Sequence, residues 1–335
     1  MLRTLLIPVI FEQVLNSLMG TVDTMMVSNV GSAAISAVSL VDSINVLVIQ
    51  AFSALAAGGA ILCSQYIGQK NHEMANKSAR QVLFIITAIS VAVTALCLLF
   101  RVPLLKLIFG KVESDVMTAS QVYFFYTALS FPFIALYDAG ASIFRSQGNT
   151  RGPMTVSVIS NVINIGGNAA LIWGFNMGVA GAAIATVFSQ GVSAILCYIY
   201  MMRRFDILKT TPAERKFDGA LARTLMYIGV PMGLQFSITA IGSIMLQSAN
   251  NALGTACVAA FTAAMRIKMF FMCPFESLGM AMATYSGQKL RCGQAGTYLD
   301  GSQGERLDDD CLLGVHFLCT DVRCQDFCPA LCRCL

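Results

Sequence analysis

The stretch that begins at Pro8 is apolar enough to lie in a membrane, yet it carries Glu12, Asn16 and Asp23. In a helix that turns by about 100° per residue, steps of four and seven bring these three side chains onto one face. A carboxylate inside a bilayer is costly, and by default it faces a protein interior and marks an ion or substrate pathway. Desolvation there would let Asp23 bind and release a proton near neutral pH. The alternative for Asp23 is a structural hydrogen bond to a neighbouring helix.

A second polar face occurs in a long uncharged run, where Asn161, Asn164 and Asn168 follow one another at steps of four or fewer. Such amides can bond between helices, or their oxygens can bind a hard cation such as Na⁺. We predict that this helix faces the first one. Asp23 should then lie closer to Asn164 and Asn168 than to lipid.

Composition indicates which elements position these side chains. Hydrophobic residues are 56% of the chain, charged residues are 12%, and the mean hydropathy is +0.69. A soluble domain carries about 25% charged residues, and one bilayer crossing needs roughly 20 apolar residues. The sequence therefore predicts an all-α, polytopic membrane protein with eight spans. They are expected near residues 4–27, 36–62, 80–101, 118–141, 153–173, 179–202, 222–248 and 257–283.

Most basic residues fall in loops on one side of the predicted membrane. They are Arg3 and the basic residues within 70–80, 145–151 and 203–216 and at 289. The other side holds only Arg101, Lys106 and Lys111. The positive-inside rule then places the N-terminus in the cytoplasm, and the net charge of +4 gives no reason to expect nucleic acid. We expect no cleavable signal peptide, because Pro8 and Glu12 interrupt the first apolar run and no small-residue cleavage site follows.

The chain contains a sparse internal repeat with an offset of 223 positions. The matched pairs include Pro8 with Pro231, Gly31 with Gly254, Ala33 with Ala256 and Ala37 with Ala260. An even number of spans separates the copies, so both cross in the same direction, as in transporters that bind substrate between two bundles. We predict an N-terminal six-helix lobe at 1–205, a cytoplasmic linker at 206–220 and the start of a C-terminal lobe, with two helices, at 221–288.

The polar face of the first helix has no charged counterpart in the second copy. Gln235, Thr239 and Leu246 stand at the equivalent positions. Ion coupling is therefore expected in the N-terminal lobe. Glu276 is the remaining acid of interest in a span, and its simplest role is an ion pair with the basic residues at 266 and 268.

The last part of the chain, 289–335, differs from the rest in composition. It holds seven of the twelve cysteines, together with His316. Thiolates and imidazole are zinc ligands, but the spacing fits no paired C-x-x-C pattern. A reading-frame slip near Gln288-Lys289 explains more, because the same bases shifted by one position encode a glycine hinge followed by a basic amphipathic helix. We interpret this tail as frameshifted sequence.

Several motifs together resemble the multidrug and toxic compound extrusion (MATE) family over about residues 1–288. They are "PVIFEQ", "VDTMMVSNVGSAAISAVS", "SQYIGQKNHEMANK", "FRSQGNTRGPM", "NVINIGGNAALI", "MGVAGAAIATVFSQ" and "ATYSGQ". The resemblance implies a two-lobe, twelve-helix exporter that exchanges protons or sodium ions for amphipathic, often cationic, drugs or metabolites. It also implies that Asp23 is the first-helix aspartate of cation coupling. One branch of the family has an aspartate where this chain has Asn168, so the branch's proton mechanism does not transfer whole and the coupling ion stays open.

The resemblance further implies a monomer in the plasma membrane that needs no cofactor beyond H⁺ or Na⁺. We assign cation coupling to Asp23, Asn164 and Asn168. A second set of residues is expected to line the substrate cavity: Glu12, Asn16, Asn161, Gln235 and Glu276. Glu12 should open toward the space between the lobes and serve substrate cations or a second ion, unless it caps the start of its helix.

Enzymatic and ATP-driven activities are not expected, because the sequence has no phosphate-binding loop, metal-hydrolase motif or triad pattern. Two alternatives to an exporter stay open. One is a flippase for lipid-linked oligosaccharides, for which a more basic central cavity would be expected. The other is a truncated remnant without transport activity, which the altered tail suggests.

Overall fold

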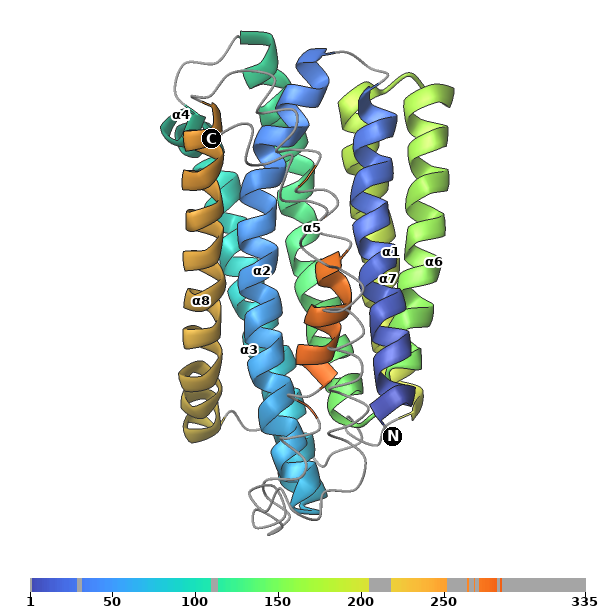
Figure 1. Cartoon of the computed structure of the whole chain (residues 1–335), viewed down its shortest axis with the longest axis vertical. Coiled ribbons are helices and arrows are strands. Elements are labelled where there is room, and N and C mark those ends of the chain that lie inside the picture. Colours follow the sequence, from blue (N-terminus) through green and yellow to red (C-terminus); the bar gives the residue numbers. More distant parts are fainter. Residues whose placement is uncertain are drawn as a thin grey trace, which may run out of the picture.

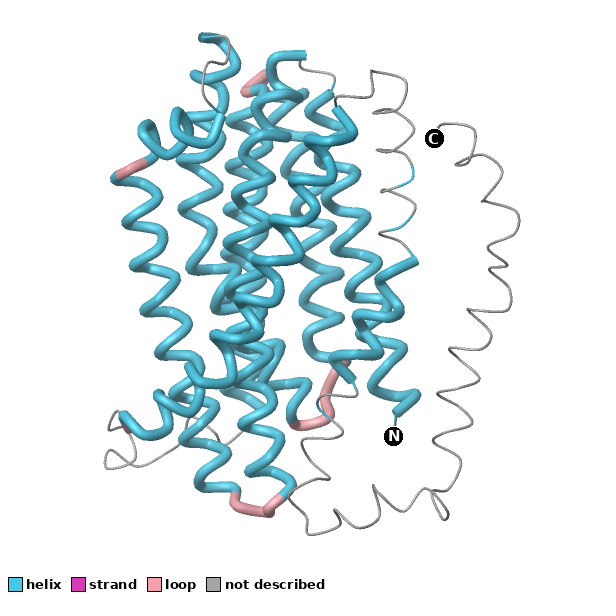
Figure 2. Tube along the Cα trace, turned by 60° about the vertical axis from the view of Figure 1, so that its left-hand side comes forward, coloured by secondary structure: helices cyan, strands magenta, loops and turns pink. Residues whose placement is uncertain are grey.

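The computed structural model describes residues 2–28, 32–109, 114–204, 218–251, 271–281 and the single positions 264, 268 and 284. These residues form helices joined by turns and include no β-strand. The elements are α1 (Leu2–Ser28), α2 (Ser32–Gly68), α3 (His72–Leu99), α4 (Arg101–Phe109), α5 (Ser114–Ser146), α6 (Arg151–Asn168), the π-helix η1 (Ala169–Gly174), α7 (Gly178–Arg204) and α8 (Gly219–Asn251). Residues 271–281 add a further helical segment. Figures 1 and 2 show these helices as a bundle of roughly aligned rods.

The helices occur where the apolar runs predict them, and most extend further. The predicted span at 80–101 is part of α3, which begins at His72, where the Asn71 side chain accepts a hydrogen bond from the Met74 backbone and caps the helix. The break between the predicted spans 153–173 and 179–202 also occurs, as the turn between η1 and α7. Two elements were not predicted: the short helix α4 and the π-helical turn η1.

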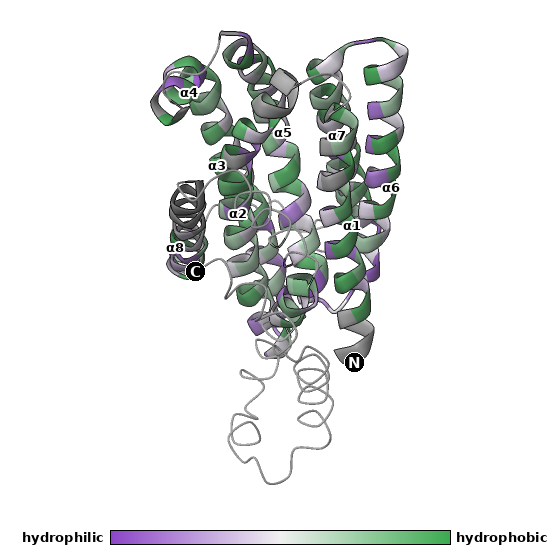
Figure 3. Cartoon of the chain, turned by 45° about the horizontal axis from the view of Figure 1, so that its top comes forward, coloured by the Kyte–Doolittle hydropathy of each residue, from purple (hydrophilic) through white to green (hydrophobic). Residues whose placement is uncertain are grey.

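Five of the described helical segments are long and apolar enough to cross a membrane. They are Ala37–Gly68, His72–Leu99, Asp115–Ser146, Arg151–Gly174 and Gly178–Arg203. Large apolar side chains such as Val162, Phe188 and Ile238 are more than half exposed, and green, hydrophobic segments dominate the ribbon in Figure 3. Such surfaces are suited to contact with lipid tails, because apolar side chains have no polar groups that need a hydrogen-bond partner. The chain is an all-α, multi-pass membrane protein.

Helix α5 lies at the centre of the bundle and packs against α2, α3 and α7. Buried aromatic rings fill this centre, and Phe52 of α2 meets Phe131 of α5 edge to face with ring centroids 6.3 Å apart. Helix α1 packs mainly on α6, which in turn packs on α7. The polar faces of α1 and α6 are therefore brought together inside one group of helices.

Helix α8, the first helix of the second repeat, packs on α2 and α3. It approaches α2 closely at two glycines, because a Cβ added to Gly58 would lie 2.9 Å from the Cα of Gly229. Only glycine at position 58 permits this crossing. The segment 271–281, drawn in orange in Figure 1, lies instead beside α1 and α5, where Gln13 and Arg145 both contact Met280.

The N-terminus and the turn between α2 and α3 lie at the bottom of Figure 1, and α4 lies at the top. The turn between α5 and α6 uses Gly148 with a φ of 79°, a conformation that favours glycine. Pro153 follows in the first turn of α6, where a missing N–H costs little. The linker core at 205–217 and the tail at 289–335 lie outside the described residues, so the boundaries, the frame slip and the zinc alternative stay predictions.

Candidate functional site

Asp23 of α1 and Asn168 of α6 are in direct contact. The Asn168 side-chain amide donates a hydrogen bond to Asp23 Oδ1 at 2.5 Å. The same Nδ2 group lies 3.2 Å from Asn164 Oδ1, one helical turn earlier. The structure thus brings together Asp23, Asn164 and Asn168, as the two polar faces predicted.

The two asparagines are fully buried, with 0% exposure each, and α7 completes their surroundings. The Asn164 amide lies 3.4 Å from Thr186 Oγ1 and 3.5 Å from Ser189 Oγ. Asn168 Oδ1 accepts no hydrogen bond from the described residues. A buried amide oxygen without a donor is costly, so this atom is available to a bound cation or water.

Two residues that sequence reasoning did not select stand beside Asp23. Asp42 of α2 interacts electrostatically with Asp23, and Tyr123 of α5 donates a hydrogen bond to Asp42 Oδ1 at 3.4 Å. Asn45, one turn after Asp42, lies 3.5 Å from the same carboxylate oxygen. The sequence held a signal for Asp42, since it is an acid within the apolar span predicted at 36–62.

The helix that carries the asparagines changes its geometry directly after Asn168. From Ala169 to Gly174 it continues as a π-helix, and the Phe175 N–H bonds back to the Ala170 carbonyl oxygen at 3.1 Å. π-helical turns inside α-helices occur often at functional sites. Gly167 lets α7 approach here, because its Cβ would lie 3.2 Å from the Cβ of Ala185.

A second level of the α1–α6 contact lies one to two turns away. Ser157 Oγ donates to Asn16 Oδ1 at 2.9 Å, and the Asn161 amide donates to the Ser157 carbonyl oxygen at 2.8 Å. Asn16 and Asn161 are therefore joined through Ser157. The Ser157–Asn16 bond joins α6 to α1, whereas the Asn161 bond lies within α6.

Glu12 does not open toward a space between lobes, and that expectation was wrong. Its side chain is 2% exposed, its Oε1 atom lies 2.7 Å from an Arg145 guanidinium nitrogen, and Tyr137 Oη donates to the same oxygen at 2.9 Å. The reason is that Arg145, at the end of α5, reaches back over α1. A buried carboxylate is far cheaper with such a partner than facing a cavity alone.

The two candidates from the second repeat are not brought to Asp23. Gln235 is exposed on α8. Glu276 is exposed on the segment 271–281, and among the described residues no ion pair joins it to Lys268. Residue 266, the other basic partner expected for Glu276, lies outside the described residues.

The Asp23 site is thus acidic and rich in oxygen atoms. Asp23 and Asp42 supply two carboxylates, and no Lys or Arg of the described residues pairs with Asp23. Carboxylate and amide oxygens are ligands for hard cations, and two neighbouring carboxylates also favour binding of a proton. The residues present therefore fit either a proton or Na⁺.

Comparisons with known proteins find a family model and relatives that are similar to this chain. The MatE family model matches residues 8–170. The probable multidrug resistance protein YoeA of Bacillus subtilis is 28% identical over 295 residues, which cover 85% of this chain and 63% of YoeA. The probable multidrug resistance protein NorM of Thermotoga maritima is 26% identical over 292 residues, which cover 85% of this chain and 61% of NorM.

Solved structures agree on the fold. A mutant of the Vibrio cholerae MATE transporter VcmN superposes with a TM-score of 0.82 at 22% identity, over 88% of this chain and 66% of that one. In the sequence comparisons, the chain spans less than two thirds of the length of YoeA and of NorM.

Proposed function

We propose that the chain is a member of the multidrug and toxic compound extrusion family, and that it forms the first lobe, and the start of the second, of a secondary exporter. The exporter exchanges H⁺ or Na⁺ for amphipathic, often cationic, small molecules by alternating access. Its place is the plasma membrane, with the N-terminus in the cytoplasm. The sorting of basic residues into loops at one end supports this orientation.

The observation that carries the proposal is the Asp23–Asn168 contact inside the N-terminal lobe. A transporter of this kind needs a group whose charge changes when the coupling ion leaves. Asp23 is such a group. The described side chains around it are amides and a second acid, and none of them is basic. The negative charge of Asp23 is therefore free to be neutralised by an exchangeable cation.

The bound ion would supply one positive charge to this site. Asp23 would hold it, together with the unpartnered Asn168 Oδ1 and with Asn164 Oδ1. Loss of the ion would leave a carboxylate in an apolar bundle, which favours a rearrangement of α1 against α6 that hydrates or pairs it. This link between ion occupancy and helix packing would couple the ion gradient to alternating access.

Dye efflux tests the proposal. The full chain is expressed in cells that lack their own efflux pumps, and the accumulation of a fluorescent cationic dye is measured. Expression should lower accumulation, and Asp23→Asn should abolish the effect at equal protein level, because an amide carries no exchangeable charge. The control Glu73→Gln removes an acid that is exposed at the start of α3 and should export as the parent does. Normal export by Asp23→Asn would contradict the coupling role, and no export by the parent chain would contradict transport by this chain.

A further inference from the structure

A second group of ionisable side chains lies toward the other end of α1. We call Glu12, Tyr137, Asp138, Arg145 and Cys197 the Glu12 cluster. Arg145 and Tyr137 both bond to Glu12 Oε1, at 2.7 and 2.9 Å, and Tyr137 Oη also lies 3.3 Å from the Pro153 carbonyl oxygen of α6. Asp138 of α5 interacts electrostatically with Arg145 and Glu12, and Cys197 of α7 interacts with all three.

The charges of the Glu12 cluster do not balance when both acids are ionised. Glu12 and Asp138 carry two negative charges, and among the described residues the Arg145 guanidinium carries the single positive charge that faces them. Arg145 makes its ion pair with Glu12 and none with Asp138 among the described residues. One carboxylate in an apolar bundle is thus left without a counter-charge, and a fully ionised cluster would be costly.

Two carboxylate oxygens of the Glu12 cluster also lack a donor. Glu12 Oε2 and Asp138 Oδ2 are buried and accept no hydrogen bond from any described residue. Glu12 as a whole is 98% buried, and Arg145, which it contacts through Oε1, would repel a metal cation placed beside Oε2. A proton fits this environment better than a metal ion, because it neutralises one oxygen and needs no set of further ligands.

We propose that the Glu12 cluster holds one exchangeable proton, carried by the carboxyl group of Asp138, as a second titrating site besides Asp23. The protonated state is a neutral Asp138 carboxylic acid beside the Glu12–Arg145 charge pair. Loss of the proton to solvent leaves two carboxylates and one guanidinium. The site differs from Asp23 in having a basic residue at its centre.

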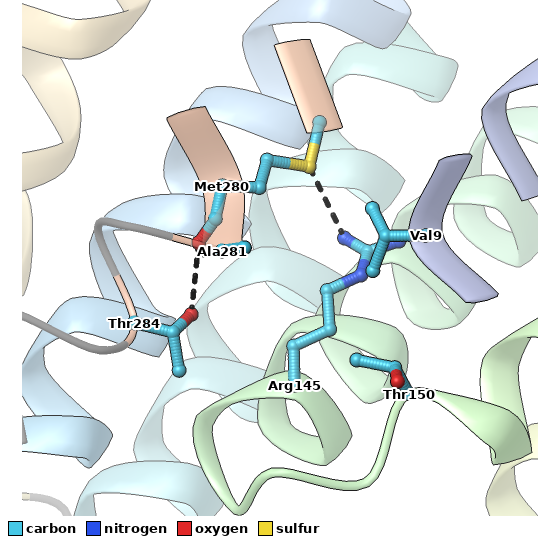
Figure 4. Close-up of a pocket in the computed structure, with 6 residues that line it drawn as sticks. All are labelled: Val9, Arg145, Thr150, Met280, Ala281 and Thr284. Carbon is cyan, nitrogen blue, oxygen red and sulfur yellow. Dashed lines mark hydrogen bonds between the residues drawn. The ribbon is translucent and has the colours of Figure 1, made fainter. Parts of the chain in front are cut away.

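The Glu12 cluster adjoins the contact between the two repeats. Arg145 Nη1 lies 3.8 Å from the Met280 sulfur, and Gln13, next to Glu12, lies 3.9 Å from the same atom. Figure 4 shows a pocket beside this contact, lined by Val9, Arg145, Thr150, Met280, Ala281 and Thr284. Because Asp138 interacts electrostatically with Arg145, and Arg145 contacts Met280, a change of charge at Asp138 would also affect how α5 meets the segment 271–281.

Infrared difference spectroscopy tests the proposal on the full chain in lipid vesicles. The carboxylic acid C=O band is compared between mildly acidic and mildly alkaline pH, in H₂O and D₂O. Asp138→Asn leaves a balanced Glu12–Arg145 pair, and Glu12→Gln leaves Asp138 with Arg145. Each variant should lose the signal of one titrating carboxyl group relative to the parent.

Two further variants test whether the carboxyl signal depends on the positive charge of Arg145 and whether it is separate from that of Asp23. Arg145→Gln removes the positive charge, so the two acids should keep more protonated carboxyl signal at each pH than in the parent. Asp23→Asn should remove a different signal and leave that of the Glu12 cluster in place. Thermal unfolding of each variant verifies that it is folded. Equal pH-difference bands in the parent, Asp138→Asn and Glu12→Gln would overturn the proposal, because the cluster would then neither gain nor lose a proton between the two pH values.

Discussion

Two acidic residues of α1 have very different roles, and the residues beside each of them determine its role. Glu12 and Asp23 lie on one helical face, yet Glu12 is neutralised by Arg145 while Asp23 is held by an amide. The first arrangement fixes α1 to α5. The second leaves a charge that an exchangeable ion can neutralise.

Removal of Arg145 should be far more damaging than removal of an exposed basic residue. Arg145→Met leaves Glu12 buried without its partner, and breaking a buried pair in this way costs about 3–5 kcal/mol. Lys77→Met is the matched control, because it breaks the exposed Lys77–Glu73 pair at 3.5 Å, for which a cost of about 0.3–0.5 kcal/mol is typical. The denaturation midpoints of the two variants measure the difference. Equal midpoints would contradict the structural role of the Glu12–Arg145 pair.

At the scale of elements, the positions of the helices could be predicted from hydropathy because lipid demands long apolar runs with internal hydrogen bonds. The facing of α1 and α6 could also be predicted, since both carry polar residues at helical spacing. The partner of Glu12 could not, because Arg145 is 133 positions away and only the tertiary packing selects it. Neither α4 nor η1 has a composition that distinguishes it from its surroundings.

The crossing of α2 and α8 should depend on the absence of a side chain at position 58. Gly58→Ala would place a methyl group 2.9 Å from the Gly229 Cα, and backbone cannot yield as a flexible side chain does. Overpacking of this kind costs about 1–3 kcal/mol. Gly233→Ala is the control on the same helix α8, because nothing lies within 4 Å of its added Cβ. Thermal unfolding should separate the two variants, and an unchanged midpoint for Gly58→Ala would show that the crossing is looser than the structure has it.

At the scale of the whole molecule, topology follows from the charges of the loops and can be tested by labelling. Single cysteines are introduced at Lys70 and Gln147, in the turns at one end, and at Lys106 of α4, at the other, in a background without native cysteines. A membrane-impermeant maleimide applied to intact cells should label only the Lys106 position. External labelling of the positions at 70 and 147 would reverse the orientation.

The central claim is that Asp23 binds the coupling ion, and the single tryptophan of the chain allows a direct measurement. Trp173 lies in η1, five positions after Asn168, so a change in ion occupancy should alter its fluorescence. The purified chain in lipid vesicles is titrated with NaCl against choline chloride at fixed pH, and with acid at fixed Na⁺. The account predicts a saturable fluorescence change with at least one of the two ions, its loss in Asp23→Asn and its retention in Glu73→Gln. An identical, saturable response of Asp23→Asn and the parent chain would contradict it.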